Sequence, residues 1–517
     1  MTVYRSPHDD IEIPPISITE QLFQGLDLEP GGVVLVDGPS GRELTAGALK
    51  NQIRRFAGGL TARGYGAGTV VAMMAPNIPE YATVFHGVAW AGGTVTTINP
   101  VYTAHEVRKQ LDDSAAKVLV VPSVFLDTAR KAAEGGTVEL IVVIDGAEGE
   151  TSLADVMGDP LESQAMVDPA THVVALPYSS GTTGLPKGVM LSHRNLVANV
   201  AQMRQAQPLT PEDCTIAFLP FFHIYGMTVL MNCYLSAGAK LVTMPRFDLE
   251  MFLRLIADHK PRRLYVVPPV ALGLAKHPLV EQFDVSSVEQ VFSGAAPLGG
   301  EIGDQCAARM SAVMTQGYGM TELSPVSHTT PRAAPRSGSS GVLVPNCEAK
   351  VVDPGTLEEK GPGEEGELWV KGPNVMLGYL NNAEATRDAI TMDGWLRTGD
   401  LAVVDADGYL FVRERVKELI KFKGFQVAPA ELEAELCSHP GIADAAVLGR
   451  KDDEAGEVPV GFIVKAAGVD LSEDEVREHM RGRLASYKQL AEVHFVNEVP
   501  KSASGKILRR LLRDRID

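Results

Sequence analysis

The stretch SSGTTGLPKG, Ser179–Gly188, lies between two apolar runs that both read as strands. Ser192 then stands where the N-cap of a helix is expected, at the start of HRNLVANVAQMRQA. A Walker A loop would need Ser or Thr directly after its lysine and would lead straight into a helix, whereas Lys187 is followed by Gly188. The stretch still combines glycines, hydroxyls and one cation, which suits polyphosphate oxygens, although plain surface turns share this composition.

Composition favours an ordinary globular protein with more than one domain. The 517 residues are 45% hydrophobic and 22% charged, and a net charge of -18 argues against a nucleic-acid surface. The cysteines form no CxxC pair, so neither a disulfide framework nor a zinc site is expected. The chain shows no signal-peptide pattern, and its apolar run at 84–98 is too interrupted to span a membrane. We therefore expect a cytoplasmic protein.

The pattern of elements predicts an α/β fold. Strand-like runs alternate with helical patterns up to about residue 330, which favours parallel sheets with helices on both faces. A Pro/Gly/Ser break at 331–341 leads into shorter strands, and so into a β-rich segment. From about Arg413 the pattern changes to a small α+β domain, with a helix expected over 472–488. The charged joint RERVKELIKFKG should be crossed by few buried contacts, so it could bend.

Further motifs follow the glycine-rich stretch in a fixed order. They are PFFHIYG (220–226), QGYGMTE (316–322), GWLRTGD (394–400), ERVKELIKFKGFQVAPAELE (414–433) and PKSASGKILRR (500–510). Over nearly the whole chain they resemble the adenylate-forming superfamily of acyl-CoA ligases, luciferases and adenylation domains. Within this superfamily, the motifs most resemble those of 4-coumarate–CoA ligases and their bacterial relatives. The resemblance implies a large AMP-binding domain at 1–412, a hinge at 413–417 and a small mobile domain at 418–517.

The resemblance also implies an ATP-dependent carboxylic acid–CoA ligase. A carboxylate attacks the α-phosphate of ATP and releases diphosphate, and the CoA thiol then attacks the acyl-adenylate and releases AMP. Asp400 is expected in a turn, where its carboxylate would accept hydrogen bonds from ribose, and Glu322 is expected shortly after a glutamine-glycine turn. The implied nucleotide-binding residues are Ser179, Ser180, Gly181, Thr182, Thr183, Gly184, Lys187, Gln316, Gly317, Tyr318, Thr321, Asp400 and Arg415. The implied Mg²⁺ ligands are Glu322 and Thr182.

The C-terminal motifs supply the implied catalytic and hinge residues. Taken alone, SASGKILRR reads as a flexible tail before a basic helix, and His223 reads as an ordinary core histidine. With the family, Lys506 bridges the attacking carboxylate and the α-phosphate. The implied catalytic residues are Lys506, His223, Lys421 and Gln426, the hinge residue is Lys417, and the CoA-binding residues are Arg246, Lys423 and Gly424.

The acyl pocket leaves the substrate open between classes of acid. Its implied lining is Tyr225, Val229, Ala295 and Gly317. Small residues leave room for a flat ring or a straight chain, so a hydroxycinnamate or cinnamate is expected first and a medium-chain fatty acid second. An adenylation enzyme that loads a carrier protein in trans, a luciferase and a non-enzymatic nucleotide sensor are the alternatives. Glu414-Arg415 stands where the family often has Asp-Arg, and Arg397 replaces a frequent histidine; both departures bear on the hinge rather than on adenylation.

Overall fold

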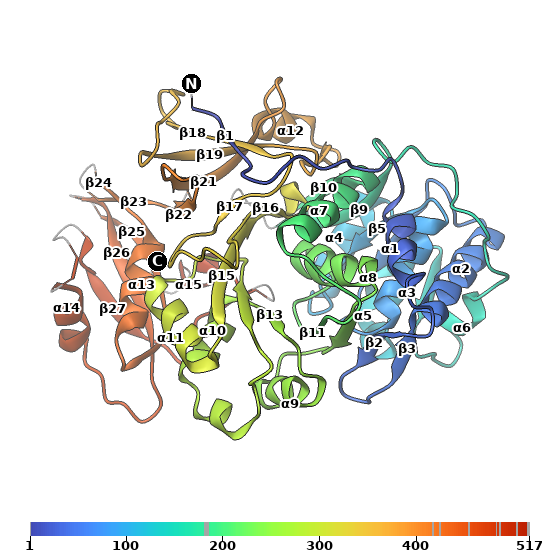
Figure 1. The fold of residues 1–517 in the computed structure, drawn as a ribbon, viewed down its shortest axis with the longest axis horizontal. Helices are drawn as coiled ribbons and strands as arrows, with labels where there is room; N and C mark the ends of the chain where they lie inside the picture. The colour runs from blue at the N-terminus through green and yellow to red at the C-terminus, as the bar shows by residue number, and fades with distance from the viewer. Residues whose placement is uncertain are drawn as a thin grey trace.

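The computed structural model describes residues 2–179, 186–415, 418–422, 425–452, 455–481, 483–484, 488–502 and 505–513. The chain up to β22 builds four β-sheets with their covering helices, and a further sheet belongs to the C-terminal lobe. This lobe, orange to red in Figure 1, lies against α10 (Pro268–Lys276) and α11 (Gly300–Met310). The Lys276 ammonium donates to the Cys437 carbonyl across this contact at 3.3 Å.

An eight-stranded sheet forms the centre of the N-terminal part. Its order is β20 (Gly378–Tyr379), β10 (Lys187–Ser192), β9 (Val173–Ser179), β5 (Thr94–Thr97), β4 (Val70–Met73), β6 (Val118–Val121), β7 (Leu140–Val143) and β8 (Thr151–Ser152). The strands from β9 to β8 are parallel, and β10 and β20 continue the sheet antiparallel. The predicted parallel sheet is therefore confirmed, with an antiparallel edge.

Helices cover both faces of this sheet because its strands are apolar on both sides. In β6, Val118 and Val120 join the main core while Leu119 and Val121 join a second core on the other face. The main core includes α2 (Ala46–Ala62), α3 (Glu80–Trp90) and α7 (His193–Ala206), and the second core includes α4 (Ala104–Ser114) and α5 (Leu126–Ala133). Ser192 caps α7 in a capping box with Asn195, as its position predicts.

Two further sheets extend the N-terminal part. The first has the order β11 (Cys214–Ala217), β12 (Lys240–Thr243), β2 (Val33–Asp37) and β3 (Glu43–Thr45), and α9 (Leu249–His259) follows β12. The second has the order β13 (Arg263–Val266), β14 (Gln290–Ser293), β15 (Val313–Gly319), β16 (Val326–Thr329) and β17 (Val342–Leu343). Gln316 and Gly317 lie within β15, so the predicted turn at this dipeptide is wrong.

The predicted β-rich segment is an antiparallel sheet. Its order is β1 (Tyr4–Arg5), β18 (Glu348–Val352), β19 (Glu365–Lys371), β21 (Leu396–Val404) and β22 (Leu410–Arg415). Asp400 lies inside β21, opposite Arg415 of β22, and not in the turn that the sequence predicted. The strand continues through Gly399 because that residue adopts φ +71°, which favours glycine.

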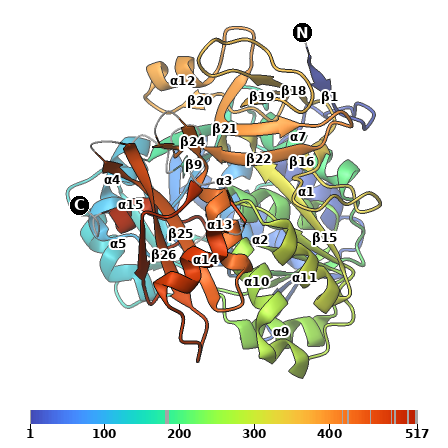
Figure 2. The same cartoon turned by 90° about the vertical axis from the view of Figure 1, so that its left-hand side faces the viewer.

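The C-terminal lobe is α+β, as expected, and packs helices on both faces of one sheet (Figure 2). Its sheet holds β23 (Ile420–Phe422), β24 (Phe425–Val427), β25 (Ile442–Asp452), β26 (Gly456–Lys465) and β27 (Glu492–Phe495), and its helices are α13 (Pro429–Ser438), α14 (Glu473–Arg481) and α15 (Arg509–Arg513). Helix α14 ends at Arg481, earlier than the predicted helix over 472–488. In the described part of the chain, no helix has the length and apolar character that a membrane span requires.

Candidate active site

The glycine-rich stretch connects two antiparallel strands. Ser179 ends β9 and pairs with Lys187, the first residue of β10, so the stretch joins two strands as predicted. The Lys187 ammonium lies 4.9 Å from the centre of the Tyr379 ring. The Ser179 hydroxyl is buried and has no hydrogen-bond partner among the described residues, which leaves it available to a ligand. The predicted phosphate contacts Ser180, Gly181, Thr182, Thr183 and Gly184 lie outside the described residues.

The motif QGYGMTE brings two more predicted residues to the same region. Thr321 and Glu322 follow β15 in a short 3-10 helix, η4 (Thr321–Leu323), and both are buried. The Tyr379 hydroxyl donates to a Glu322 carboxylate oxygen at 2.8 Å, so one tyrosine contacts both Glu322 and Lys187. Glu322 is not a surface carboxylate, because only 5% of the residue is exposed.

Asp400 forms a buried polar pair with Tyr318 and Arg415. The Tyr318 hydroxyl donates to Asp400 Oδ2 at 2.6 Å, and Arg415 Nε lies 3.2 Å from Oδ1. Burial raises the pKa of the Asp400 carboxyl, and the neighbouring Arg415 and Tyr318 oppose this shift. The phenol of Tyr318 is thus anchored at its hydroxyl.

Lys506 of the C-terminal lobe lies among these groups. Burial lowers the pKa of the Lys506 ammonium, Arg415 lowers it further, and the carboxylates of Asp400 and Glu322 oppose the shift. The lysine follows Gly505, whose backbone packs on the N-terminal part: a Cβ added there would lie 3.1 Å from Cβ of Val267. The motif taken alone reads as a flexible tail, but its described residues pair with one another: Lys501 pairs with Ile507, and the Ser502 amide donates to the Lys506 carbonyl.

His223, from the N-terminal part of the chain, lies near Lys506. Burial and the adjacent Lys506 charge lower the pKa of this imidazole to about 3, so the ring is neutral at physiological pH. Its Nδ1 accepts a hydrogen bond from the Tyr225 amide at 3.3 Å, at the start of a π-helix, η2 (Tyr225–Asn232). The described parts of both lobes therefore bring His223, Lys506, Asp400 and Glu322 together.

Three of the predicted acyl-pocket residues, Tyr225, Ala295 and Gly317, lie at or next to the C-terminal ends of β14 and β15. The Tyr225 ring lies against Gly294, next to Ala295, and its buried hydroxyl has no partner among the described residues. A Cβ at Gly317 would lie 2.5 Å from the Phe292 ring, so only glycine fits beside that phenyl group. Val229 instead borders a small gap against Met203, Cys233 and Tyr265.

The sequence motifs do not point to Phe292 or Tyr379. Each follows or ends a short apolar run that reads as plain core sequence, and their roles depend on partners distant in the chain. The unpartnered Ser293 and Thr228 hydroxyls near Tyr225 were missed for the same reason.

The joint between the lobes contains buried ionic contacts. The Glu414 carboxylate, which is 6% exposed, accepts hydrogen bonds from the Arg415 amide at 2.9 Å and from the Ala430 amide of the C-terminal lobe at 2.8 Å. Arg509 pairs with Glu418 at 2.7 Å. The expectation of few buried contacts is therefore wrong: charged side chains are buried here because each has a partner.

The remaining predicted residues lie on the outside or beyond the described parts. Lys421 is exposed on β23, and Arg246 is exposed after β12. Lys417, Lys423 and Gly424 lie outside the described residues, and of Gln426 only the backbone, which pairs with Lys421, is described.

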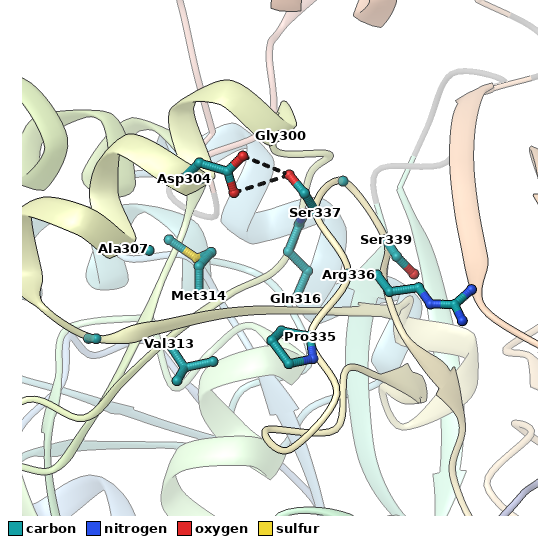
Figure 3. A pocket seen from close by; sticks show the side chains of 13 residues that line it. Gly300, Asp304, Ala307, Val313, Met314, Gln316, Pro335, Arg336, Ser337 and Ser339 are labelled. Atoms are coloured by element: carbon teal, nitrogen blue, oxygen red, sulfur yellow. Dashed lines mark hydrogen bonds between the residues drawn. The ribbon is translucent and has the colours of Figure 1, made fainter.

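A pocket of about 400 Å³ opens beside β15 (Figure 3). It is bounded by α11 and the 335–339 loop, where the Ser337 hydroxyl donates to Asp304 at 3.2 Å. The Gln316 side chain lies at the edge of this pocket, where its amide group donates to the Leu298 carbonyl and accepts from the Leu298 amide, both at 3.2 Å. The pocket therefore borders the strand that carries the nucleotide motif.

The described residues suit Mg²⁺ only together with phosphate. No group of three or more His, Cys, Asp or Glu side chains in the described part of the chain could hold a metal by itself. Mg²⁺ at nucleotide sites is typically held by one or two carboxylates plus phosphates and water. The single buried carboxylate of Glu322 fits that pattern.

Comparison with known proteins agrees with this geometry. The family model described as "AMP-binding enzyme" matches residues 24–380, and its C-terminal domain model matches 431–506. The chain belongs to the AMP-binding enzyme family. It is an AMP-forming acid–thiol ligase by its relatives: 4-coumarate–CoA ligase 3 of Oryza sativa subsp. japonica is 42% identical over 100% of this chain and 95% of that protein, and 4-coumarate–CoA ligase 1 of Petroselinum crispum is 40% identical over 99% and 97%.

Solved structures of this family have the same fold. The anthranilate CoA ligase AuaEII in complex with anthranoyl-AMP superposes with a TM-score of 0.90 at 27% identity, covering 98% of each chain. ATP-bound MatB from Rhodopseudomonas palustris gives 0.87 at 30% identity, covering 97% of this chain and 99% of that one. The predicted α/β fold with a large N-terminal and a small C-terminal domain is confirmed.

Proposed function

We propose that this AMP-binding enzyme is a carboxylic acid–CoA ligase that acts on a hydroxycinnamate-type acid. The observation that carries the proposal is the position of Lys506, which extends from the C-terminal lobe into a site that holds Asp400, Glu322 and His223. A cation delivered there by one lobe suits a reaction that joins two anions, a carboxylate and a phosphate.

The first step would form an acyl-adenylate. A carboxylate oxygen attacks the α-phosphorus of ATP, the bond to the β-phosphate oxygen breaks, and diphosphate leaves. Lys506 bridges the two anions, Lys187 and the 180–184 loop hold the outer phosphates, and Asp400 accepts hydrogen bonds from ribose. Mg²⁺, held by Glu322 and Thr182, would neutralise phosphate charge.

The second step would transfer the acyl group to CoA. The thiol sulfur attacks the acyl carbon, the bond to the adenylate oxygen breaks, and AMP leaves. Lys421 and Gln426 act near the acyl-adenylate in this step, and Arg246, Lys423 and Gly424 contact CoA. Lys421 is exposed here while Lys506 is in the site. The proposal therefore includes a turn of the small domain, residues 418–517, about Lys417 in the hinge 413–417, relative to residues 1–412.

The acid is proposed from the pocket and from the relatives. The buried Tyr225 hydroxyl has no partner among the described residues and offers a polar contact, which suits a phenolic ring better than an alkyl chain. The two relatives named above are 4-coumarate–CoA ligases. A medium-chain fatty acid is the second candidate, since Ala295 and Gly317 also leave room for a straight chain. Transfer to a carrier protein and a cytoplasmic location stay predictions.

One experiment tests the proposal. Purified protein is incubated with ATP, Mg²⁺, CoA and a panel of cinnamates, benzoates and fatty acids, and AMP and thioester are measured. 4-Coumarate should give the highest kcat/KM. Lys506→Ala should lower acid-dependent ATP–diphosphate exchange by about 10²–10³-fold. Absence of AMP with every acid would refute the proposal.

A further inference from the structure

Tyr379 is fixed at the edge of the central sheet, next to the glycine-rich stretch. Its strand β20 pairs with β10, where Val189 lies opposite Tyr379. The Leu380 amide donates to the Gly188 carbonyl at 2.8 Å, and the Tyr379 amide donates to the Thr386 hydroxyl at 2.9 Å. The backbone under this ring is therefore held from two sides.

The side chain contacts two groups that the proposed function places on ATP. Its hydroxyl donates to the Glu322 carboxylate at 2.8 Å, and its ring lies under the Lys187 ammonium at 4.9 Å from the ring centre. Glu322 and Lys187 come from separate strand ends and are 135 residues apart (322 minus 187).

We propose that Tyr379 is a positioning residue that holds Glu322 and Lys187 in the arrangement that receives the magnesium-bound triphosphate. This inference rests on the proposed function. The hydroxyl fixes the orientation of the carboxylate, so that this group meets the metal already oriented. The ring keeps the lysine ammonium beside the loop through a cation–π contact, which is weaker than an ion pair with a triphosphate and therefore allows transfer to ATP.

The two contacts can be separated by substitution. Tyr379→Phe removes the hydroxyl and keeps the ring, whereas Tyr379→Leu removes both. Tyr178→Phe is a matched control. Tyr178 lies on β9 of the same sheet, and its hydroxyl also donates to a carboxylate, that of Asp113, at 2.6 Å. The readout is the dissociation constant of a fluorescent, non-hydrolysable ATP analogue, measured with excess Mg²⁺ and with EDTA.

The expected results differ between the variants. Tyr379→Phe should lose about tenfold or more of the affinity for the analogue with Mg²⁺, since it removes a hydrogen bond to a charged group, and should match wild type in EDTA. Tyr379→Leu should also lose several-fold in EDTA because the lysine is no longer held. In a Glu322→Gln background, Tyr379→Phe should add no further loss, which a merely structural role would not produce. Tyr178→Phe should bind as wild type does.

Failure of the inference and failure of the proposed function are distinguishable. If Glu322→Gln and Lys187→Ala weaken binding while Tyr379→Phe binds as wild type with Mg²⁺, the positioning role is refuted. If Glu322→Gln and Lys187→Ala themselves bind the analogue normally, the proposed nucleotide site is wrong, and the inference is lost with it.

Discussion

Replacement of Arg509 tests whether its ion pairs hold the segment that carries Lys506 in place. Arg509 begins α15, three residues after Lys506, and donates to Glu418 at 2.7 Å, to Glu433 at 2.8 Å and to the Val447 carbonyl at 3.0 Å. The arginine therefore ties the lysine hairpin to the segment after the hinge and to the sheet of the small domain.

The expected magnitude follows from the burial of these partners. The magnitude is set by Glu433, whose side chain is 13% exposed, rather than by Glu418, which is 32% exposed. Loss of one member of such a mostly buried ion pair costs about 3–5 kcal/mol, because the other charge stays buried without compensation. A small domain has a total stability of about 5–15 kcal/mol, so Arg509→Ala should leave the C-terminal lobe folded but close to its limit. Its opening equilibrium should rise about a hundred- to a few thousandfold, at 1.4 kcal/mol for each factor of ten.

Hydrogen–deuterium exchange measures this change by region. Amides of β25 and β26 should exchange faster in Arg509→Ala by that factor, whereas β9 of the N-terminal domain should be unaffected. Arg509→Lys should lie between the two because it keeps the charge but loses the planar fork. Arg513→Ala, at an exposed arginine of the same helix, is the control. Equal exchange in Arg509→Ala and Arg513→Ala would show that the buried pairs do not stabilise the loop.

The remaining predictions concern acid stability and the acyl pocket. Burial lowers the pKa of His86 to about 3, below about 6.5 in the unfolded chain, so its contribution to stability is complete above pH 6.5 and is lost as the pH falls. In urea titrations, the free energy of unfolding at pH 5 should be about 2 kcal/mol lower than at pH 7.5. His86→Gln should not show this decrease. The control variant His105→Gln, at an exposed histidine, should retain it. Tyr225→Phe should lower kcat/KM for 4-coumarate about tenfold relative to cinnamate, in an assay of thioester formation with both acids; an unchanged ratio would remove the hydroxyl contact. Gly317→Ala should abolish acid-dependent AMP release while ATP binding survives, because Phe292 leaves no space for the methyl group; full activity would contradict this packing.

The fold was largely predictable because its signals are local. The strand–loop–strand–helix order around the glycine-rich stretch and the Ser192 cap follow from residues within one turn or strand of each other. The parallel sheet follows from strands that are apolar on both faces, as β6 is. The length of α14 was overestimated because charge-rich helical patterns do not show where a helix loses its packing surface.

Site residues could be predicted from the sequence only where they lie within one distinctive motif. Lys187, Glu322 and Lys506 were found because each lies in a distinctive string of residues. Tyr379 and Phe292 were not found, because each acts through a contact with a residue distant in the chain. Their sequence surroundings are those of ordinary core residues, and composition or periodicity carries no information about such tertiary partners.

The charged joint between the lobes is a second example in which contacts distant in the chain could not be predicted from the sequence. Its density of charge predicted exposure, since isolated charges are rarely buried. Burial raises the pKa of the Glu414 carboxyl to about 7, yet the Ala430 and Arg415 amides and the nearby Arg509 offset much of the cost of burying it. Partners supplied by a different segment thus reversed a conclusion that held for the segment alone.

The internal contacts of Asp400 reconcile a preformed site with its use by a ligand. A carboxylate has about four acceptor positions, and Tyr318 and Arg415 occupy one on each oxygen of Asp400. Two ribose hydroxyls could therefore bind to the remaining positions without displacing either protein partner. Because the protein donors already hold the carboxylate in place, nucleotide binding pays little to order it. In the proposed mechanism, Arg415 and Lys506 beside Asp400 would supply positive charge for the attack on phosphorus before ATP arrives.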